Sequence, residues 1–364
     1  KNELTGQKFR KLEEQCRSVV LLIVDEISFI GRAIFARMHF RLQQAMRRFF
    51  AETGLDPNEY TFGNLSLILV GDSGQLEPID DWSMCDTETT KQSCPRILRR
   101  HWRHAEQGRL LMRTFDEAVI LSRILRSKDD LWWTESCLRL RDYRCTQAGD
   151  WDWWRLHDLD REHLSQEQVR YFEEEALWLC ARCEDVGSRN GRKLAHMAED
   201  RKALVHKLRA EHSHRSGRKH SSGVFGGLRQ VRDCKVVLTR NVSYLYGLTN
   251  GTRGRMVGVV YGPGGVGTLP EAIVCEFPDY CGPAFYSGEP KWVPILPNVS
   301  IKEGTRQTRE QFPVVAGYAL TVNKAQGLTL KEGVVINLTS GKRFKAASKH
   351  GLPFVAFTRS ESFA

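Results

Sequence analysis

The sequence predicts an α/β protein built on parallel sheets, and three consecutive features near its start carry that prediction. Residues 19–24 are an unbroken apolar run that ends in Asp25-Glu26, the pattern of a strand buried on both faces of a parallel sheet. A second apolar run, residues 65–70, ends in a Gly-Asp turn. Strand, helix and strand, with an acidic turn after each strand, is the βαβ pattern of a nucleotide-binding sheet. The intervening helix is expected from apolar side chains at helical spacing: Phe35, Met38, Leu42, Met46 and Phe49.

The second half of the sequence predicts a small β module set inside a second α/β domain. The Asn250-Gly251 pair is a frequent hairpin turn, and it follows a strand expected at residues 234–238. Short extended runs separated by Gly and Pro come next, and we expect them to close a small β-barrel. These runs are residues 255–260, 272–277 and 291–295. Strand-like runs resume at 313–316, 334–338 and 354–357, which we assign to the second α/β domain.

Composition points to a polyanionic partner. The chain has 364 residues, 41% of them apolar, so it can bury more than one core. Its net charge of +10 favours nucleic acid, because clustered Lys and Arg release counterions from phosphates. No apolar run approaches the roughly 20 residues that cross a bilayer, and no secretory leader opens the chain. We therefore expect an intracellular protein with no membrane partner. A Lys-, Arg-, Gly- and Ser-rich segment, residues 201–232, is expected to be a flexible basic insertion.

The cysteines do not predict a disulfide framework or a metal site. The ten cysteines are scattered along the chain without regular spacing, so reduced thiols are expected. Cys180 and Cys183 form a lone CxxC, and a zinc site would need a second ligand pair. None stands at suitable spacing. We interpret this CxxC as a buried strand end.

Two acidic strand ends carry the candidate chemistry. In a Walker B arrangement, Asp25 would hold Mg²⁺ through water and Glu26 would polarise the attacking water. The alternative is an acidic strand end that caps the next helix. The loop GDSGQLEP, residues 71–78, places Gln75 at the neighbouring strand end, where its amide can reach the γ-phosphate of ATP. Gly71 and Asp72 of this loop are expected to line the nucleotide.

These segments resemble the PIF family of superfamily-one DNA helicases. VDEIS and GDSGQLEPI are similar to the family's motifs II and III. LSRILRSKD, residues 121–129, resembles motif IV, and GYALTVNKAQGLTL, residues 317–330, resembles motif V. FVAFTRS, residues 354–360, resembles motif VI, and residues 238–258 resemble the family's lead-in to a small β-barrel. These matches fall in the family's order across nearly the whole chain, so together they are far more specific than any single one.

The resemblance implies two RecA-like parallel-sheet domains that form an ATP- and Mg²⁺-dependent motor travelling five-prime to three-prime on single-stranded DNA. It implies that Arg126 reaches the γ-phosphate and that Arg359 acts as an arginine finger. Gln326 and Gly327 of motif V are expected to contact the nucleotide. The residues expected at the DNA backbone are Thr321, Asn323 and Lys324, with Asn241 as a further candidate.

The sequence departs from the family pattern at several positions. Asn323 and Ala325 stand where the family has His and Ser, while Ser73 replaces an aromatic residue and Glu77 a proline. We expect these changes to weaken coupling between hydrolysis and movement. No GxxxxGK[ST] phosphate loop occurs; residues 262–268 come close, with Thr in the place of the Lys. The family carries this loop upstream of motif II, so we expect a first RecA-like domain truncated at its N-terminus.

The expected domain organisation follows from these motifs. Residues 1–130 would be the remainder of the first RecA-like domain. Residues 131–249 and 312–364 would form the second RecA-like domain, and residues 250–311 the β-barrel insertion between its two parts.

The predicted function is an ATP-dependent DNA helicase that serves replication, repair, recombination or telomere maintenance in the nucleus, the mitochondrion or both. Its partners would be single-stranded DNA and DNA junctions, and a monomer is expected. Because the phosphate loop is absent, this chain is expected to be inactive alone. One alternative is a catalytically inactive, nucleic-acid-binding remnant of a transposon helicase. Another is an unrelated nucleotidase that shares only the Walker B strand, which would make motifs V and VI coincidental.

Overall fold

The computed structural model describes residues 4–85, 101–145, 164–213, 227–265, 268–301, 307–330, 333–338 and 350–361. The chain divides into two compact units. The first contains Lys1–Arg144 and Lys349–Val355, and the second contains Cys145–Ser348 and Ala356–Ala364. Within the described ranges, no helix is long and apolar enough to span a membrane.

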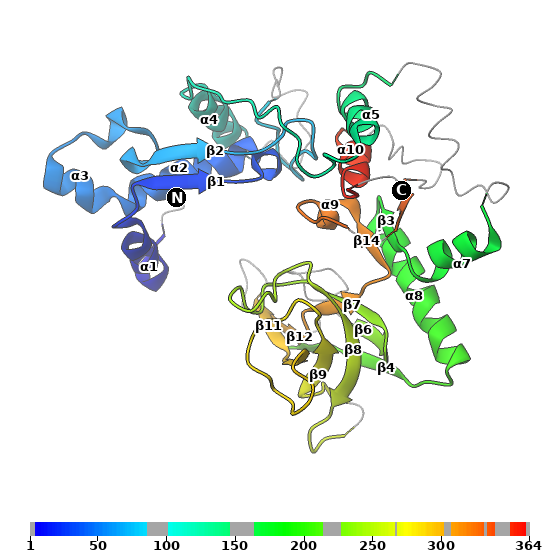
Figure 1. Ribbon diagram of the computed structural model, residues 1–364. Helices are drawn as coiled ribbons and strands as arrows, with labels where there is room; N and C mark the ends of the chain where they lie inside the picture. Colours follow the sequence, from blue (N-terminus) through cyan, green and yellow to red (C-terminus); the bar gives the residue numbers. More distant parts are fainter. Residues whose placement is uncertain are drawn as a thin grey trace. The chain divides into compact units, whose positions relative to one another are not determined.

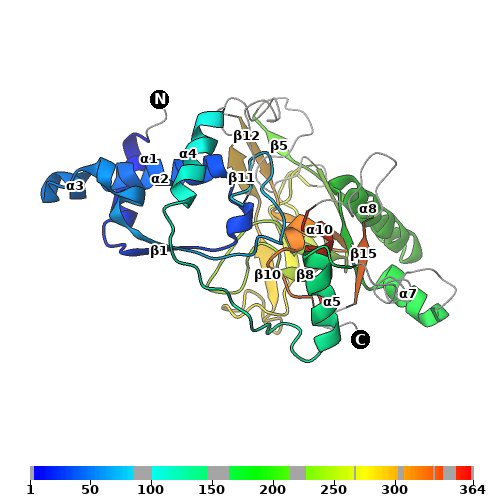
Figure 2. The ribbon, with the colours of Figure 1, turned by 90° about the horizontal axis from the view of Figure 1, so that it is seen from above.

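The first unit contains the predicted βαβ element (Figures 1 and 2). Strands β1 (Leu21–Val24) and β2 (Ser66–Leu69) pair in parallel, with Val24 opposite Leu69. Helix α2 (Arg32–Ala45) connects them, and it buries Phe35, Ala36 and Leu42 against the strands. Both predicted strands and the predicted helix are confirmed. The other helices of this unit are α1 (Gly6–Cys16), α3 (Arg47–Thr53), α4 (Trp102–Met112) and α5 (Leu131–Arg141), with 3₁₀ turns η1 (Ile27–Phe29), η2 (Pro57–Glu59) and η3 (Thr61–Asn64).

The prediction that these strands are buried on both faces is wrong for this chain. Leu22, Leu67 and Leu69 pack into the core beneath α2. On the opposite face Leu21 and Ile23 are 43% and 61% exposed. An apolar run reports that both faces of a strand are hydrophobic, but whether a second layer covers them depends on other elements. In the described residues only one layer packs on this pair of strands.

The second unit contains a three-stranded parallel sheet. Its order is β14 (Ala319–Thr321), β3 (Leu177–Cys180) and β15 (Val334–Asn337), with β3 in the centre. Helix α7 (Gln166–Glu174) precedes β3 and begins at a capping box formed by Ser165 and Gln168. Helix α8 (Cys183–Asp200) follows β3, and α9 (Val322–Ala325) follows β14. The carboxyl ends of β3 and β14 therefore lead directly into helices, as in open α/β sheets generally.

The same unit contains an antiparallel module. Its main sheet has the order β10 (Trp292–Ile295), β9 (Ala272–Glu276), β8 (Arg253–Val260), β7 (Lys235–Leu238) and β13 (Val314–Ala316). Strands β7 and β8 pair antiparallel, and the long connection between them, residues 239–252, ends in the predicted Asn-Gly turn, where Gly251 has a φ of 95° that only glycine adopts without strain. Two smaller sheets join β11 (Asn298–Ile301), β12 (Thr308–Gln311) and β5 (Glu211–His212), and β4 (Val205–Arg209) with β6 (Gly227–Val231).

Three sequence predictions in this region are corrected. Residues 314–316 form β13 in the antiparallel sheet rather than a strand of the parallel one. Residues 354–357 belong to helix α10 (Leu352–Phe357), because a short apolar run does not distinguish a buried helix from a strand. The basic segment is not wholly flexible: its two ends form β4 and β6, whose Leu208 and Leu228 are buried. Its residues 214–226 lie outside the described residues.

Candidate functional site

The two acidic turns of the first unit lie side by side. Val70 N donates to Val24 O at 2.8 Å, and Ile27 N donates to Val70 O at 3.0 Å, so the ends of β1 and β2 are joined just where the acidic residues begin. Glu26 has a left-handed φ of 54°, and its backbone N–H donates to Asp25 Oδ1 at 2.8 Å. The sharp turn separates the two carboxyl groups: Asp25 lies exposed at the strand end, whereas Glu26 is half-buried. The two side chains therefore lie in different environments.

The loop after β2 packs closely against this turn. A Cβ on Gly71 would lie 2.7 Å from Ile27 Cγ2 and 2.9 Å from Ile27 N, so only glycine fits there. Asp72 Oδ1 accepts from Gly74 N at 2.8 Å, and Gln75 N donates to Asp72 O at 3.1 Å. These bonds close a tight turn that presents Gln75. The Gln75 Oε1 atom is buried and accepts no hydrogen bond from the described residues. A buried acceptor of this kind usually has a partner, and water or a ligand can supply it.

Residues remote in sequence fasten this loop, and sequence reasoning missed them. Arg141, in the last turn of α5, donates to Asp72 Oδ1 through Nε at 3.1 Å and Nη2 at 2.8 Å. His350 Nε2 donates to Ser73 O at 2.9 Å, while its Nδ1 accepts from Tyr143 OH at 3.0 Å. All of these residues belong to the first unit. The structure thus places the Arg141 guanidinium against the loop, whereas Arg126 lies exposed in a segment without helix or strand.

The residues of these turns fit a Mg²⁺-nucleotide in part. Mg²⁺ typically takes one or two carboxylates and completes its shell with water and phosphate oxygens. Asp25 supplies such a carboxylate, and the described residues contain no cluster of three His, Cys, Asp or Glu that would form an all-protein site. The Gln75 acceptor lies on the adjacent loop. The chain contains no GxxxxGK[ST] loop to hold the phosphates.

In the second unit, motif V and motif VI are joined to each other. Thr321 ends β14 and is buried, and α9 follows with Asn323 half-buried and Lys324 exposed. Arg359 of motif VI is hydrogen-bonded to the end of motif V: Leu330 N donates to Arg359 O at 2.8 Å, and Arg359 Nη1 donates to Leu328 O at 3.2 Å. Arg359 is 3% exposed. Gln326 is half-buried and Gly327 has a φ of 81°, which turns the chain out of α9.

Asn190 of α8 is a positioning residue that the sequence did not reveal. Its Nδ2 donates to Ala316 O at 3.0 Å and to Ala319 O at 3.2 Å. Its Oδ1 accepts from Tyr318 N at 3.1 Å and from Ala319 N at 2.8 Å. One side chain therefore satisfies four backbone groups of the chain that leads into motif V. In sequence it resembles any polar residue on a solvated helix face, so no local pattern could identify it.

Comparison with known proteins finds distant similarity to DNA helicases. No protein-family model matches the chain. The human ATP-dependent DNA helicase PIF1 is 24% identical over 351 residues, which cover 94% of this chain and 44% of that protein. The zebrafish (Danio rerio) protein of the same name is 23% identical over 354 residues, covering 94% of this chain and 45% of its own. Over nearly its whole length the chain is therefore similar to PIF1 DNA helicases. It spans less than half the length of these relatives.

Solved structures agree with this chain in fold. The crystal structure of the Pif1 helicase from Candida albicans superposes with a TM-score of 0.65 and 21% identity, covering 98% of this chain and 74% of that one. Bacteroides Pif1 bound to single-stranded DNA gives a TM-score of 0.60 and 18% identity, covering 100% of this chain and 74% of the other. These likenesses confirm the predicted RecA-like α/β fold.

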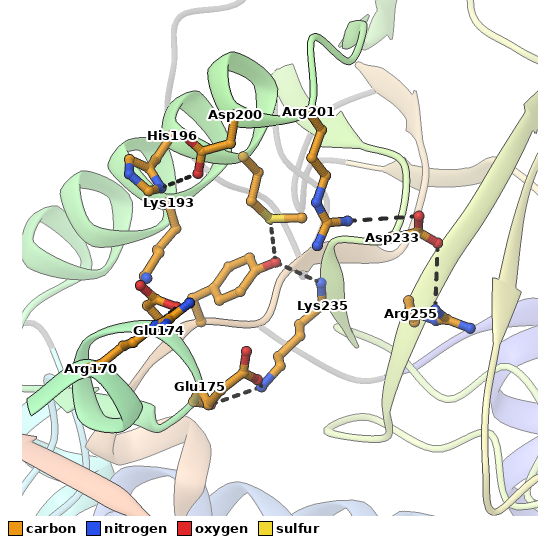
Figure 3. Close-up of a pocket in the computed structure, with 12 residues that line it drawn as sticks. Arg170, Glu174, Glu175, Lys193, His196, Asp200, Arg201, Asp233, Lys235 and Arg255 are labelled. Atoms are coloured by element: carbon orange, nitrogen blue, oxygen red, sulfur yellow. Dashed lines mark hydrogen bonds and ion pairs between the residues drawn. The ribbon is translucent and has the colours of Figure 1, made fainter. Parts of the chain in front are cut away.

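The second unit also contains a charged pocket (Figure 3). It has a volume of about 450 Å³ and is lined by α7, α8, β7 and β8. Glu175 on its wall precedes β3, so the pocket lies toward the amino end of the parallel sheet, opposite the edge where such sheets bind nucleotides. Most of the charged lining residues form ion pairs: Arg170 with Glu174, Lys235 with Glu175, His196 with Asp200, and Arg201 and Arg255 with Asp233.

A buried tyrosine anchors this pocket. Tyr318 OH donates to Met197 Sδ at 2.7 Å and accepts from Lys235 N at 3.2 Å. Burial raises the pKa of Tyr318 to about 12, so the hydroxyl stays protonated and keeps donating. The polar lining residues bond to one another within the second unit. We therefore interpret this pocket as a structural contact between its parallel and antiparallel sheets.

The CxxC of the chain is a strand end, as its sequence suggested. Cys180 is buried at the end of β3, and burial raises its thiol pKa to about 11. Cys183 is exposed at the start of α8. A thiol that stays protonated is a poor metal ligand.

Proposed function

We propose that this chain is the part of an ATP-dependent DNA helicase of the PIF1 type that activates water at the first motor domain and grips single-stranded DNA with the second. The observation that carries the proposal is the pairing of two acidic turns at the carboxyl ends of β1 and β2, with motifs V and VI bonded together in the other unit. A motor needs metal- and water-binding groups on one sheet and cationic and DNA-binding groups on the other.

In this proposal Asp25 holds Mg²⁺ through water, Glu26 orients the attacking water, and Gln75 contacts the γ-phosphate. Bound Mg²⁺-ATP would supply the phosphoryl group and the charge that draws the two motor domains together. Arg126, Arg359, Gln326, Gly327, Gly71 and Asp72 would surround the nucleotide. Thr321, Asn323 and Lys324 would contact the DNA backbone, since polar and cationic side chains position phosphates without reading sequence.

We also propose the partners, the direction of travel and the cellular setting of this helicase. Single-stranded DNA and DNA junctions are the partners, five-prime to three-prime is the direction, and a monomer is the working unit. Replication, repair, recombination or telomere maintenance in the nucleus or mitochondrion is the setting. Asn241 has a structural role as well, because its Oδ1 accepts from Asn250 N at 2.8 Å and its Nδ2 donates to Tyr244 OH.

A second candidate function is a nucleic-acid-binding remnant of a transposon helicase that no longer hydrolyses ATP. The absence of a GxxxxGK[ST] loop from the sequence favours it. Both candidates require the second unit to bind single-stranded DNA, and they differ in whether ATP turnover can be restored.

DNA binding is tested by its salt dependence. The chain is expected to bind oligo-dT with little sequence preference, with affinity falling steeply as salt rises. Lys324→Ala should flatten the log–log salt slope by about 0.7, the value for one phosphate contact on a single strand. The matched control is Lys207→Ala, which removes the same charge from an exposed position on β4. Equal slopes for the two variants would refute motif V as a DNA contact, and no binding by the parent chain would refute the proposed function.

A further inference from the structure

A turn between β7 and β8 exposes a group of apolar side chains. Within residues 242–248, here called the tyrosine turn, Tyr244 and Leu245 are 74% and 84% exposed. Val242 and Tyr246 are also exposed. Exposed apolar side chains in single positions are ordinary, but four within five residues on one turn form a patch that favours contact with another molecule.

The tyrosine turn is held in shape by its own hydrogen bonds. Ser243 and Leu248 exchange backbone bonds, Ser243 N to Leu248 O at 3.0 Å and Leu248 N to Ser243 O at 2.9 Å. Leu248 is buried beneath it, and Asn241 Nδ2 donates to Tyr244 OH. Gly247 has a φ of 75°, so the chain reverses without strain. A turn that is fixed in this way presents its apolar side chains at little cost in conformational entropy on binding.

The base of the same loop contacts motif V. A Cβ on Gly251 would lie 3.0 Å from Leu328 Cδ2, so the backbone at Gly251 packs against the motif V leucine. Both residues belong to the second unit. The tyrosine turn therefore belongs to a loop whose base packs on motif V at Leu328, four residues after Lys324. The cationic Arg240 lies between β7 and the turn, with its guanidinium donating to Asn298 Oδ1.

We propose that Tyr244 of the tyrosine turn stacks on unpaired bases of single-stranded DNA whose backbone is held by motif V, and that Leu245 makes apolar contact with the same bases. This inference rests on the proposed function and adds a base-contacting surface to it. Base stacking on an aromatic ring contributes about 1–3 kcal/mol per base and tolerates any sequence, as a translocating motor requires. An exposed ring on a loop that packs on motif V can contact the bases while motif V contacts the phosphates.

The test compares stacking with charge on the same chain. Binding of labelled oligo-dT is measured by fluorescence anisotropy across a salt series for the parent, Tyr244→Ala, Leu245→Ala and Tyr244→Phe. Tyr244→Ala should weaken binding by about 5- to 100-fold at every salt concentration, with an unchanged salt slope, because stacking releases no counterions. Tyr244→Phe keeps the ring and should remain within about threefold of the parent. Leu204→Ala, at a leucine 66% exposed in the turn before β4, is the matched control for Leu245→Ala.

An abasic strand of equal length separates the possible outcomes. Against it, Tyr244→Ala and the parent should bind equally, since no base remains to stack. If Tyr244→Ala binds oligo-dT as tightly as the parent while Lys324→Ala flattens the salt slope, the stacking proposal is overturned and the proposed function stands. That result would make the tyrosine turn a contact for a protein instead. If the parent binds neither strand, both the inference and the proposed function fail.

Discussion

The 364-residue chain alone is expected to release phosphate from ATP at the background rate, even with single-stranded DNA present. The sequence has no GxxxxGK[ST] loop, so no backbone cradle or Lys neutralises the β- and γ-phosphates. The turns after β1 and β2 offer metal and water contacts but little binding of the triphosphate. A phosphate-release assay with oligo-dT checks this. Robust turnover by the chain alone would contradict the placement of the ATP site.

A chimera sharpens this prediction. Joining the phosphate-loop segment of a PIF1 helicase ahead of Lys1 should give DNA-stimulated turnover, and Glu26→Gln in that chimera should lower it by at least about 100-fold. The amide keeps the size of the side chain but cannot accept a proton from water. Asp25→Asn should instead weaken Mg²⁺-dependent nucleotide binding, because the first carboxylate serves the metal.

Control variants distinguish a catalytic role of Asp25 and Glu26 from a purely structural role in the turn after β1. Glu59→Gln, at an exposed glutamate of the same unit, should leave turnover unchanged. If Asp25→Asn and Glu26→Gln both have small and equal effects, these acids serve only to shape the turn that follows β1. A chimera that folds and binds DNA but never hydrolyses ATP would favour the inactive remnant.

The local features of the fold were predictable from the sequence because they depend on neighbouring residues. The βαβ element followed from the periodicity of residues 19–70, and β8, β9 and β10 from short extended runs set off by Gly and Pro. The acidic residues that follow β1 and β2 could be predicted to lie close together, since parallel strands place their carboxyl ends at one edge of a sheet. The pairing of Val24 with Leu69 confirms this.

Contacts between distant residues were not predictable. Arg141 and Asp72 are 69 positions apart, and His350 and Ser73 are 277 apart, so no spacing rule connects them. The residues 354–357 were misread as a strand because four apolar residues carry no period that separates strand from helix. The sequence also could not show that β1 is covered on one face only. Each failure concerns which element packs on which, and that is decided by tertiary structure.

Replacing Asn190 is expected to destabilise the chain that leads into motif V. Asn190→Ala leaves the N–H groups of Tyr318 and Ala319 and the carbonyls of Ala316 and Ala319 without this partner, at positions where water has little access. Each buried group that loses its partner costs about 1–3 kcal/mol, and partial rearrangement offsets some of this. We expect a loss of about 2–4 kcal/mol in the local stability of β14. Ser188→Ala, at an exposed position of the same helix, should change it by less than about 0.5 kcal/mol.

Hydrogen exchange is the suitable measurement, because a chain of two units need not unfold in one step. Amides of β3 and β14 should exchange faster in Asn190→Ala while those of β1 and β2 stay unchanged. Asn190→Asp is the second variant. It keeps the oxygen that accepts from Tyr318 N and Ala319 N. It replaces the amide group that donates to Ala316 O and Ala319 O with an oxygen that can only accept. If the donors matter, Asp will be at least as damaging as Ala, and binding of oligo-dT through Lys324 will weaken in both. Unchanged exchange in both variants would mean that α8 and the sheet hold motif V in place without this side chain.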